Sequence, residues 1–249
     1  MVYTPLNLSP DTPTEVDNAI RTSVELFLGD VHAMLRLPIP ELELEAGCNF
    51  AATIVLCSVI SGTSRIIYPR KGSDADQFKT LVATYFPWEE EPNPGLRCEE
   101  AADVLYEEFR NPLIHAAGLP VELKGSKQTK VSVIRYDLKE PNVTKYRGIV
   151  EAKIQELEVS RSRPISWGPT ITTDREGRKS KILVEGLYWG VREMICRLTH
   201  VPKIMEESSQ LLRSGLEPAQ NPDGNTRRHY SAGSSEAEVV SVIMPDKKT

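Results

Sequence analysis

A stretch from Glu107 to Ala116 holds the side chains of this 249-residue chain that are best suited to chemistry. Within six positions it places a permanent cation at Arg110, an amide at Asn111 and an imidazole at His115. A guanidinium can bind two oxygens of a phosphate group at once, and an imidazole that titrates near neutrality can transfer protons. These groups favour metal-independent cleavage of a phosphodiester.

Pro112 lies between the cation and the imidazole and predicts a change in the backbone. Proline disfavours helical geometry at the residue before it, so we expect a helix to break at Arg110–Asn111. Asn111 and Pro112 then fit the N-cap and first position of a new helix that carries His115 in its first turn. In one unbroken helix, five residues would rotate His115 about 140° away from Arg110. Glu107, one turn before Arg110, either holds the guanidinium or pairs with it on the surface.

A purely structural role explains the same residues. Arg110 would close a helix C-terminus, Asn111 would cap the next helix and His115 would fill a niche in the core. The apolar helices before the stretch and the basic segment after it favour the functional interpretation.

The sequence Arg110-Asn111-Pro112-Leu113-Ile114-His115 resembles the signature of the HEPN superfamily, which is an arginine, a polar residue, a few further residues and a histidine. The resemblance implies an all-helical bundle that dimerises with its two motifs facing each other. It also implies a metal-independent endoribonuclease without a cofactor, of a kind found in toxin–antitoxin and phage-defence systems. By position, Arg110 and His115 would be catalytic, and Asn111 would orient the site.

The resemblance leaves two further alternatives open. Some HEPN members lack cleavage activity and serve as RNA-binding or protein-interaction modules, and the Arg110–His115 pair would also suit a nucleotide-binding protein. Cleavage by a 2′-hydroxyl needs a base and an acid, however, and one motif supplies one histidine. A homodimer with a two-fold axis through the site would supply the second.

Hydrophobic spacing predicts a mainly α protein, a HEPN-like helical bundle with a small antiparallel β insertion. The expected helices are 14–37, 49–68, 75–86, 99–110, 187–198 and 202–213. Alternation predicts strands at 131–136, 169–173 and 179–184, with a turn at Asp174-Arg175-Glu176-Gly177. Residues 146–159 fit a strand or a short helix.

Composition divides the chain into three parts. We expect a flexible N-terminus over residues 1–12, a single domain over 13–213 that includes a β-rich segment at 124–184, and a disordered tail over 214–249. The longest apolar run, Phe50–Ile60, is short for a membrane span, and no secretory signal is apparent at the N-terminus. We therefore expect a cytoplasmic protein that does not bind membranes.

Charge is unevenly distributed, although the net charge is −5. Residues 1–118 carry 8 Lys/Arg against 18 Asp/Glu, whereas residues 124–181 carry 14 against 7. A basic segment directly after the motif fits RNA as a partner, and a solvated sheet face that balances the acidic bundle fits equally well. The candidate phosphate contacts are Lys130, Arg135, Lys145, Arg147, Arg161, Arg163, Arg175, Arg178, Lys179 and Lys181.

The remaining polar residues form no second motif. The four cysteines are scattered, so neither a disulfide framework nor a zinc site is expected. The run Glu89-Glu90-Glu91 fits a solvated loop better than a metal site, because adjacent carboxylates do not converge on one face. His32 lies beside an apolar stripe and fits a hydrogen-bonded structural histidine. An antitoxin or regulatory protein is a further expected partner.

Overall fold

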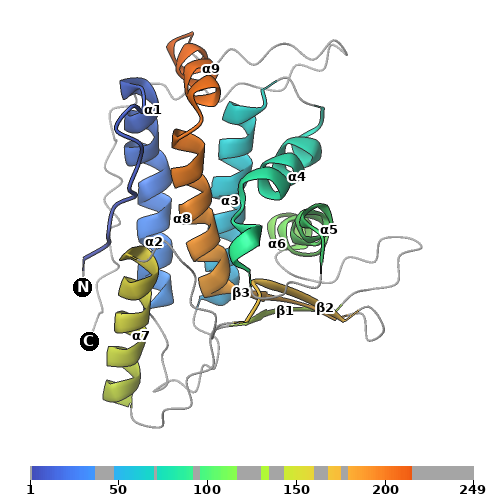
Figure 1. Ribbon diagram of the computed structural model, residues 1–249. Coiled ribbons are helices and arrows are strands. Elements are labelled where there is room, and N and C mark those ends of the chain that lie inside the picture. The colour runs from blue at the N-terminus through green and yellow to red at the C-terminus, as the bar shows by residue number, and fades with distance from the viewer. Residues whose placement is uncertain are drawn as a thin grey trace, which may run out of the picture. The chain divides into compact units, whose positions relative to one another are not determined.

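The computed structural model describes residues 2–36, 48–69, 72–91, 96–116, 130–134, 143–159, 168–174 and 179–214 (Figure 1). Most of them are helical, which confirms the mainly α prediction. The α-helices are α1 (Thr14–Ala19), α2 (Glu25–Leu35), α3 (Asn49–Ile67), α4 (Asp74–Tyr85), α5 (Cys98–Val104), α6 (Asn111–Ala116), α7 (Val143–Val159), α8 (Val184–Thr199) and α9 (Pro202–Arg213).

Two π-helical segments join neighbouring α-helices. Ile20–Val24 joins α1 to α2, and Leu105–Arg110 joins α5 to α6. The long helix predicted from Thr14 is therefore confirmed, with a wider turn inside it. The N-cap residue is Pro13, which makes no side-chain cap bond. A short 3₁₀ turn covers Trp88–Glu90.

The N-terminus of α4 shows why this helix begins where it does. Ser73 accepts a hydrogen bond from the Asp76 backbone N–H, and the Asp76 carboxylate accepts one from the Ser73 N–H. This capping box satisfies two backbone donors that a helix start leaves unpaired. The helix therefore begins at Asp74, one residue before the predicted start.

Helix α3 is apolar nearly all round, which is typical of a helix at the centre of a bundle. It contacts α2, α4, α8 and α9, and buries Leu56, Cys57 and Ile60 completely. By length and composition, the 19 residues of α3 are enough to cross a membrane. The expectation that the Phe50–Ile60 run within it is too short is therefore wrong for the helix as a whole. The core helix of a soluble protein passes the same test, and one such helix is weak evidence for a membrane span.

Helix α8 lies between α2 and α3 in Figure 1 and contacts α2, α3, α4, α7 and α9. It is buried along almost its whole length, including Tyr188 and Trp189. Gly190 lets α8 approach Phe86, because a Cβ at this position would lie 2.0 Å from the phenyl Cζ. The core of the domain is therefore built around α8 and α3.

The three strands form one sheet with the order β1-β3-β2. They are β1 (Lys130–Ile134), β2 (Ile171–Asp174) and β3 (Lys179–Leu183), and β3 runs directly into α8. The antiparallel pairing of β2 with β3 agrees with the predicted hairpin, but β1 pairs with β3 in parallel. The sheet is thus mixed and the antiparallel prediction is wrong for β1. Alternating hydrophobicity identifies a strand and carries no information on its direction.

Residues 143–159, which the sequence left open, form helix α7. Its inner side buries Val150, Ile154 and Leu157, at a spacing of three and four residues that suits a helix. α7 contacts α8.

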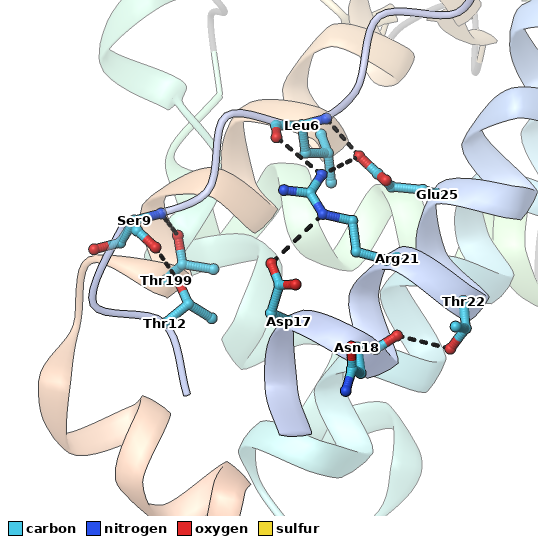
Figure 2. Close-up of polar contacts among 9 residues, drawn as sticks. All are labelled: Leu6, Ser9, Thr12, Asp17, Asn18, Arg21, Thr22, Glu25 and Thr199. Carbon is cyan, nitrogen blue, oxygen red and sulfur yellow. Dashed lines mark hydrogen bonds and ion pairs between the residues drawn. The ribbon is translucent and has the colours of Figure 1, made fainter. Parts of the chain in front are cut away.

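The N-terminal segment is packed, so the prediction of a flexible segment over residues 1–12 is wrong. Leu6 is only 4% exposed, and the Ser9 N–H donates to Thr199 Oγ1 at 3.0 Å (Figure 2). Side chains from distant helices bind its backbone, and composition alone does not reveal such contacts. The predicted tail lies outside the described residues, except for Ser214.

Candidate functional site

The backbone of the motif does not break at Pro112. Asn111 has helical dihedrals (φ −64°, ψ −52°), and its N–H donates to the Tyr106 carbonyl, five residues back. The predicted break and the N-cap role of Asn111 are therefore wrong. A proline ring clashes with the carbonyl four residues earlier in a regular α-helix, here that of Glu108, and the wider π turn just before Pro112 accommodates it.

The helical backbone also changes the expected arrangement of Arg110 and His115. Both positions lie on one continuous helical stretch, and α6 is regular from Asn111 onward. Five residues of α-helix correspond to about 140° around the axis. The backbone of one chain does not bring the two positions to one side. His115 lies in α6, and its side chain is outside the described part of the molecule.

Arg110 is half-buried and contacts residues of its own helical segment. Its Nη1 donates to Asn111 Oδ1 at 2.9 Å, and its guanidinium carbon lies 5.1 Å from the Tyr106 ring centroid. Asn111 Nδ2 donates in turn to Glu107 Oε2 at 3.3 Å. These contacts connect Glu107 to the guanidinium through the Asn111 amide, which orients both.

Lys79 of α4 joins this cluster, and sequence reasoning missed it. Its ammonium lies 2.8 Å from Glu107 Oε1, 2.9 Å from Asp103 Oδ1 and 5.3 Å from the Tyr106 ring centroid. Partial burial acts to lower the pKa of Lys79, but the hydrogen bonds to Glu107 and Asp103 outweigh it and raise the pKa. The i,i+4 spacing of Asp103 with Glu107 and of Tyr106 with Arg110 indicates one helix face, but it does not identify Lys79 as the partner of that face.

The positive charge of Arg110 also acts on Cys57, a residue of the core. Burial raises the pKa of the Cys57 thiol to about 12, and the nearby positive charge of Arg110 opposes that rise. Cys57 belongs to α3 and is fully buried. The helical stretch of the motif thus contacts both α3 and α4, and it holds a cation, an amide and a carboxylate in contact with one another.

Two of the predicted basic contacts lie on strand β3. Lys179 and Lys181 are exposed, whereas Ser180 and Ile182 between and beyond them are buried. This alternation places both lysines on the solvent face of the sheet. Lys130, Lys145 and Arg147 lie in described elements, but their side chains are outside the described part. Arg135, Arg161, Arg163, Arg175 and Arg178 lie outside the described residues.

His32 is a structural, hydrogen-bonded histidine, as the sequence indicated. Its Nδ1 lies 2.5 Å from Glu158 Oε1, and the Tyr188 hydroxyl donates to the same oxygen at 2.7 Å. All three residues are buried. Burial raises the pKa of Tyr188 well above its usual value, and the charge of Arg192 opposes this rise. Glu158 is 126 positions from His32, so no local pattern could have paired them.

Within the described ranges, no group of three or more His, Cys, Asp or Glu side chains is placed to hold a metal ion. Glu89 and Glu90 instead pair with Arg197, and Glu91 is buried against Thr170. The expectation of a solvated acidic loop is therefore wrong for Glu91.

Comparison with known proteins finds no similar protein. No family model matches the chain, and neither a curated protein nor a solved structure does.

Proposed function

We propose that this protein is a metal-independent endoribonuclease of the HEPN type, acting at a composite site between two copies of the chain. The observation that carries the proposal is the contact chain from Glu107 through Asn111 to Arg110, five positions before His115. It orients the guanidinium of a half-buried arginine. Arg110 would stabilise the non-bridging oxygens of the phosphate as charge develops there.

The proposed reaction is transesterification by the RNA 2′-hydroxyl. A base removes the proton of the 2′-OH, the oxygen attacks the adjacent phosphorus, and an acid gives a proton to the departing 5′-oxygen. The products are a 2′,3′-cyclic phosphate and a 5′-hydroxyl, with no metal or cofactor consumed. His115 of one copy would act as base and His115 of the other as acid.

The continuous helix gives a second reason to require two copies. Positions 110 and 115 of one chain lie about 140° apart around the helix axis in regular geometry. Two facing helices related by a two-fold axis could bring Arg110 of one copy to His115 of the other. We propose RNA as substrate, with the exposed Lys179 and Lys181 among the phosphate contacts.

The same proposal extends to the biological setting. A ribonuclease of this kind fits toxin–antitoxin or phage defence in the cytoplasm, with an antitoxin or regulatory protein as partner. An inactive RNA-, nucleotide- or protein-binding module is the second candidate. The contacts of Arg110 with Asn111 and with the Tyr106 ring favour it, because they engage the guanidinium within its own chain.

Cleavage of a structured RNA in EDTA tests the proposal. We expect Arg110→Ala and His115→Ala each to lower the rate by at least about 100-fold, because each removes a group that acts on the transition state. Arg97→Ala is the matched control, since Arg97 lies exposed at the start of α5 in the same helical stretch. It should cleave at the wild-type rate.

Two results would contradict this assignment. A folded His115→Ala protein with undiminished cleavage would exclude His115 from catalysis. Tight binding of mononucleotides or RNA by a wild-type protein that never cleaves would favour the binding module.

A further inference from the structure

The backbone of the N-terminal segment is held at Leu6 by a pair of opposite charges. The Leu6 N–H donates to Glu25 Oε1 at 2.5 Å, and Arg21 Nη1 donates to the Leu6 carbonyl at 3.2 Å (Figure 2). Arg21 and Glu25 also contact each other at 2.8 Å. Both polar groups of one peptide residue are thus bound by an arginine–carboxylate pair.

The same arrangement recurs two residues earlier, at Thr4. The Thr4 N–H donates to Glu158 Oε2 at 2.9 Å, and Arg192 Nη2 donates to the Thr4 carbonyl at 2.8 Å. In an extended chain the N–H and C=O groups of alternate residues point to the same side. Pro5 lies between them and has no N–H to leave unsatisfied, and it also favours extended geometry at Thr4.

The side chains of the segment are bound as well. Leu6 is almost fully buried, and the Tyr3 ring packs edge-on against His32, with centroids 5.9 Å apart. The Arg192 guanidinium lies 5.1 Å from the Tyr3 centroid. The Tyr3 ring and the Leu6 side chain are therefore both packed against the domain, and Pro5 lies between them in the sequence.

The groups that hold the segment all come from other elements. Arg21 and Glu25 lie at the join of the first π segment and α2, while Glu158 belongs to α7 and Arg192 to α8. The segment is joined to α1 through a turn, in which the Thr12 N–H and hydroxyl both donate to the Ser9 carbonyl. Side chains of these elements thus bind the backbone N–H and carbonyl groups of both Thr4 and Leu6.

We propose that this surface of α2, α7 and α8 is a docking groove for an extended peptide of the form aromatic–x–Pro–apolar, and that it accepts residues 2–8 of a second copy in exchange for its own. A second copy is the occupant because it carries the segment that makes these contacts in this structure. Exchange creates no new interface chemistry, since every contact is reproduced between chains. The groove is separate from the Arg110 motif and does not depend on RNA cleavage.

A labelled peptide with the sequence of residues 2–9 tests whether the groove works between molecules. In the full chain, Leu6→Asp places a charge at the buried position of the Leu6 side chain and so releases the chain's own segment from the groove. We expect the peptide to bind this variant at least tenfold more tightly than wild type, where the attached segment competes. Asn7→Asp is the matched charge control, because Asn7 is exposed, and its peptide affinity should equal that of wild type.

Equal peptide affinity of wild type and Leu6→Asp would overturn the proposal. So would equal binding of a peptide that itself carries Leu6→Asp. These outcomes concern the groove alone and leave the proposed ribonuclease activity untouched.

A deletion in the turn between this segment and α1 tests whether the segment exchanges between two copies of the full chain. Deleting Pro10 and Asp11 removes the turn that folds the segment back onto its own domain. We expect the mass in solution to double relative to wild type at the same concentration, and an excess of the free peptide to reverse this. A deletion variant with wild-type mass, or one whose larger mass the peptide leaves unchanged, would exclude exchange; if the deletion prevents folding, the peptide titration decides.

Discussion

Gly190 shows how a single residue sets the distance between two elements. A Cβ there would lie 2.0 to 2.9 Å from three atoms of the Phe86 ring, which is itself only 2% exposed. Gly62 of α3 offers the opposite case, because a Cβ at that position meets nothing within 4 Å. Close packing against Phe86 therefore requires a glycine at position 190, whereas no neighbouring atom requires one at position 62.

We expect Gly190→Ala to destabilise the protein by about 1–3 kcal/mol, since forced overpacking outweighs the gain in helix propensity. Gly62→Ala should stabilise it by about 0.5–1 kcal/mol, because it gains the propensity without a clash. Urea unfolding of both variants measures the two effects. A stabilised Gly190→Ala protein would mean that Phe86 can move aside.

The sequence predicts some residues of the cluster around Arg110 but not others. The residue types of Arg110 and Asn111 indicated a polar cluster, and the structure brings them into contact with Glu107. Lys79 could not be assigned to that cluster, because its contact with Glu107 spans 28 positions and depends on how α4 packs. Charged residues on helix surfaces are too common for their type alone to identify such a partner.

At the scale of elements, Glu91 joins the loop before α5 to the sheet. Its two oxygens accept from the Thr170 N–H at 2.7 Å and from the Thr170 hydroxyl at 2.6 Å. Thr170 is fully buried and its carbonyl accepts from the Leu183 N–H, at the end of β3. The carboxylate thus holds the entry to β2 against the helical part of the domain.

We expect Glu91→Ala to cost about 3 kcal/mol or more, because it leaves two buried donors of Thr170 without a partner. Glu91→Gln keeps one carbonyl acceptor and should cost less. Thr170→Val removes the hydroxyl donor to Glu91 Oε1 and keeps the backbone N–H donor to Glu91 Oε2, so it should cost less than Glu91→Ala. Urea unfolding ranks the variants, and an Ala variant as stable as Gln would contradict this role.

The elements themselves were mostly predictable because their signals are local. The spacing of apolar residues predicted α3, α4 and α8, whose observed bounds lie within a few residues of the predicted ones. The π turn at Leu105–Arg110 was not predictable, since a proline can end a helix or be accommodated by a wider turn. The parallel direction of β1 depends on the path of the chain between β1 and β3, which periodicity does not describe.

At the scale of the whole domain, several contacts join segments that are far apart in the sequence. Thr4 meets Glu158, Ser9 meets Thr199, and Arg213 of α9 pairs with Glu15 of α1. The composition of residues 1–12 suggested a flexible end because nothing in it shows these partners. Such tertiary pairings follow from the fold and cannot be deduced from one segment.

The stability of the domain should fall at alkaline pH, because a partly buried tyrosine and a buried cysteine must lose protons. Burial raises the pKa of Tyr3 to about 12, and burial raises that of the Cys57 thiol from 9.0 to about 12. In the unfolded chain both groups would ionise at their ordinary values. Above those values the unfolded state binds fewer protons than the folded state, so the free energy of unfolding decreases with pH.

We therefore expect full stability from these groups below pH 9 and a progressive loss between about pH 9 and 12. A shift of three pKa units at Cys57 corresponds to about 4 kcal/mol at most. Cys57→Ala should be less stable at every pH through its cavity, but its unfolding free energy should decline less steeply across this range. Cys48→Ala, which changes an exposed cysteine, is the control. If urea unfolding at pH 8, 9, 10 and 11 gives parallel declines for wild type and Cys57→Ala, the buried thiol is not the cause of the alkaline loss.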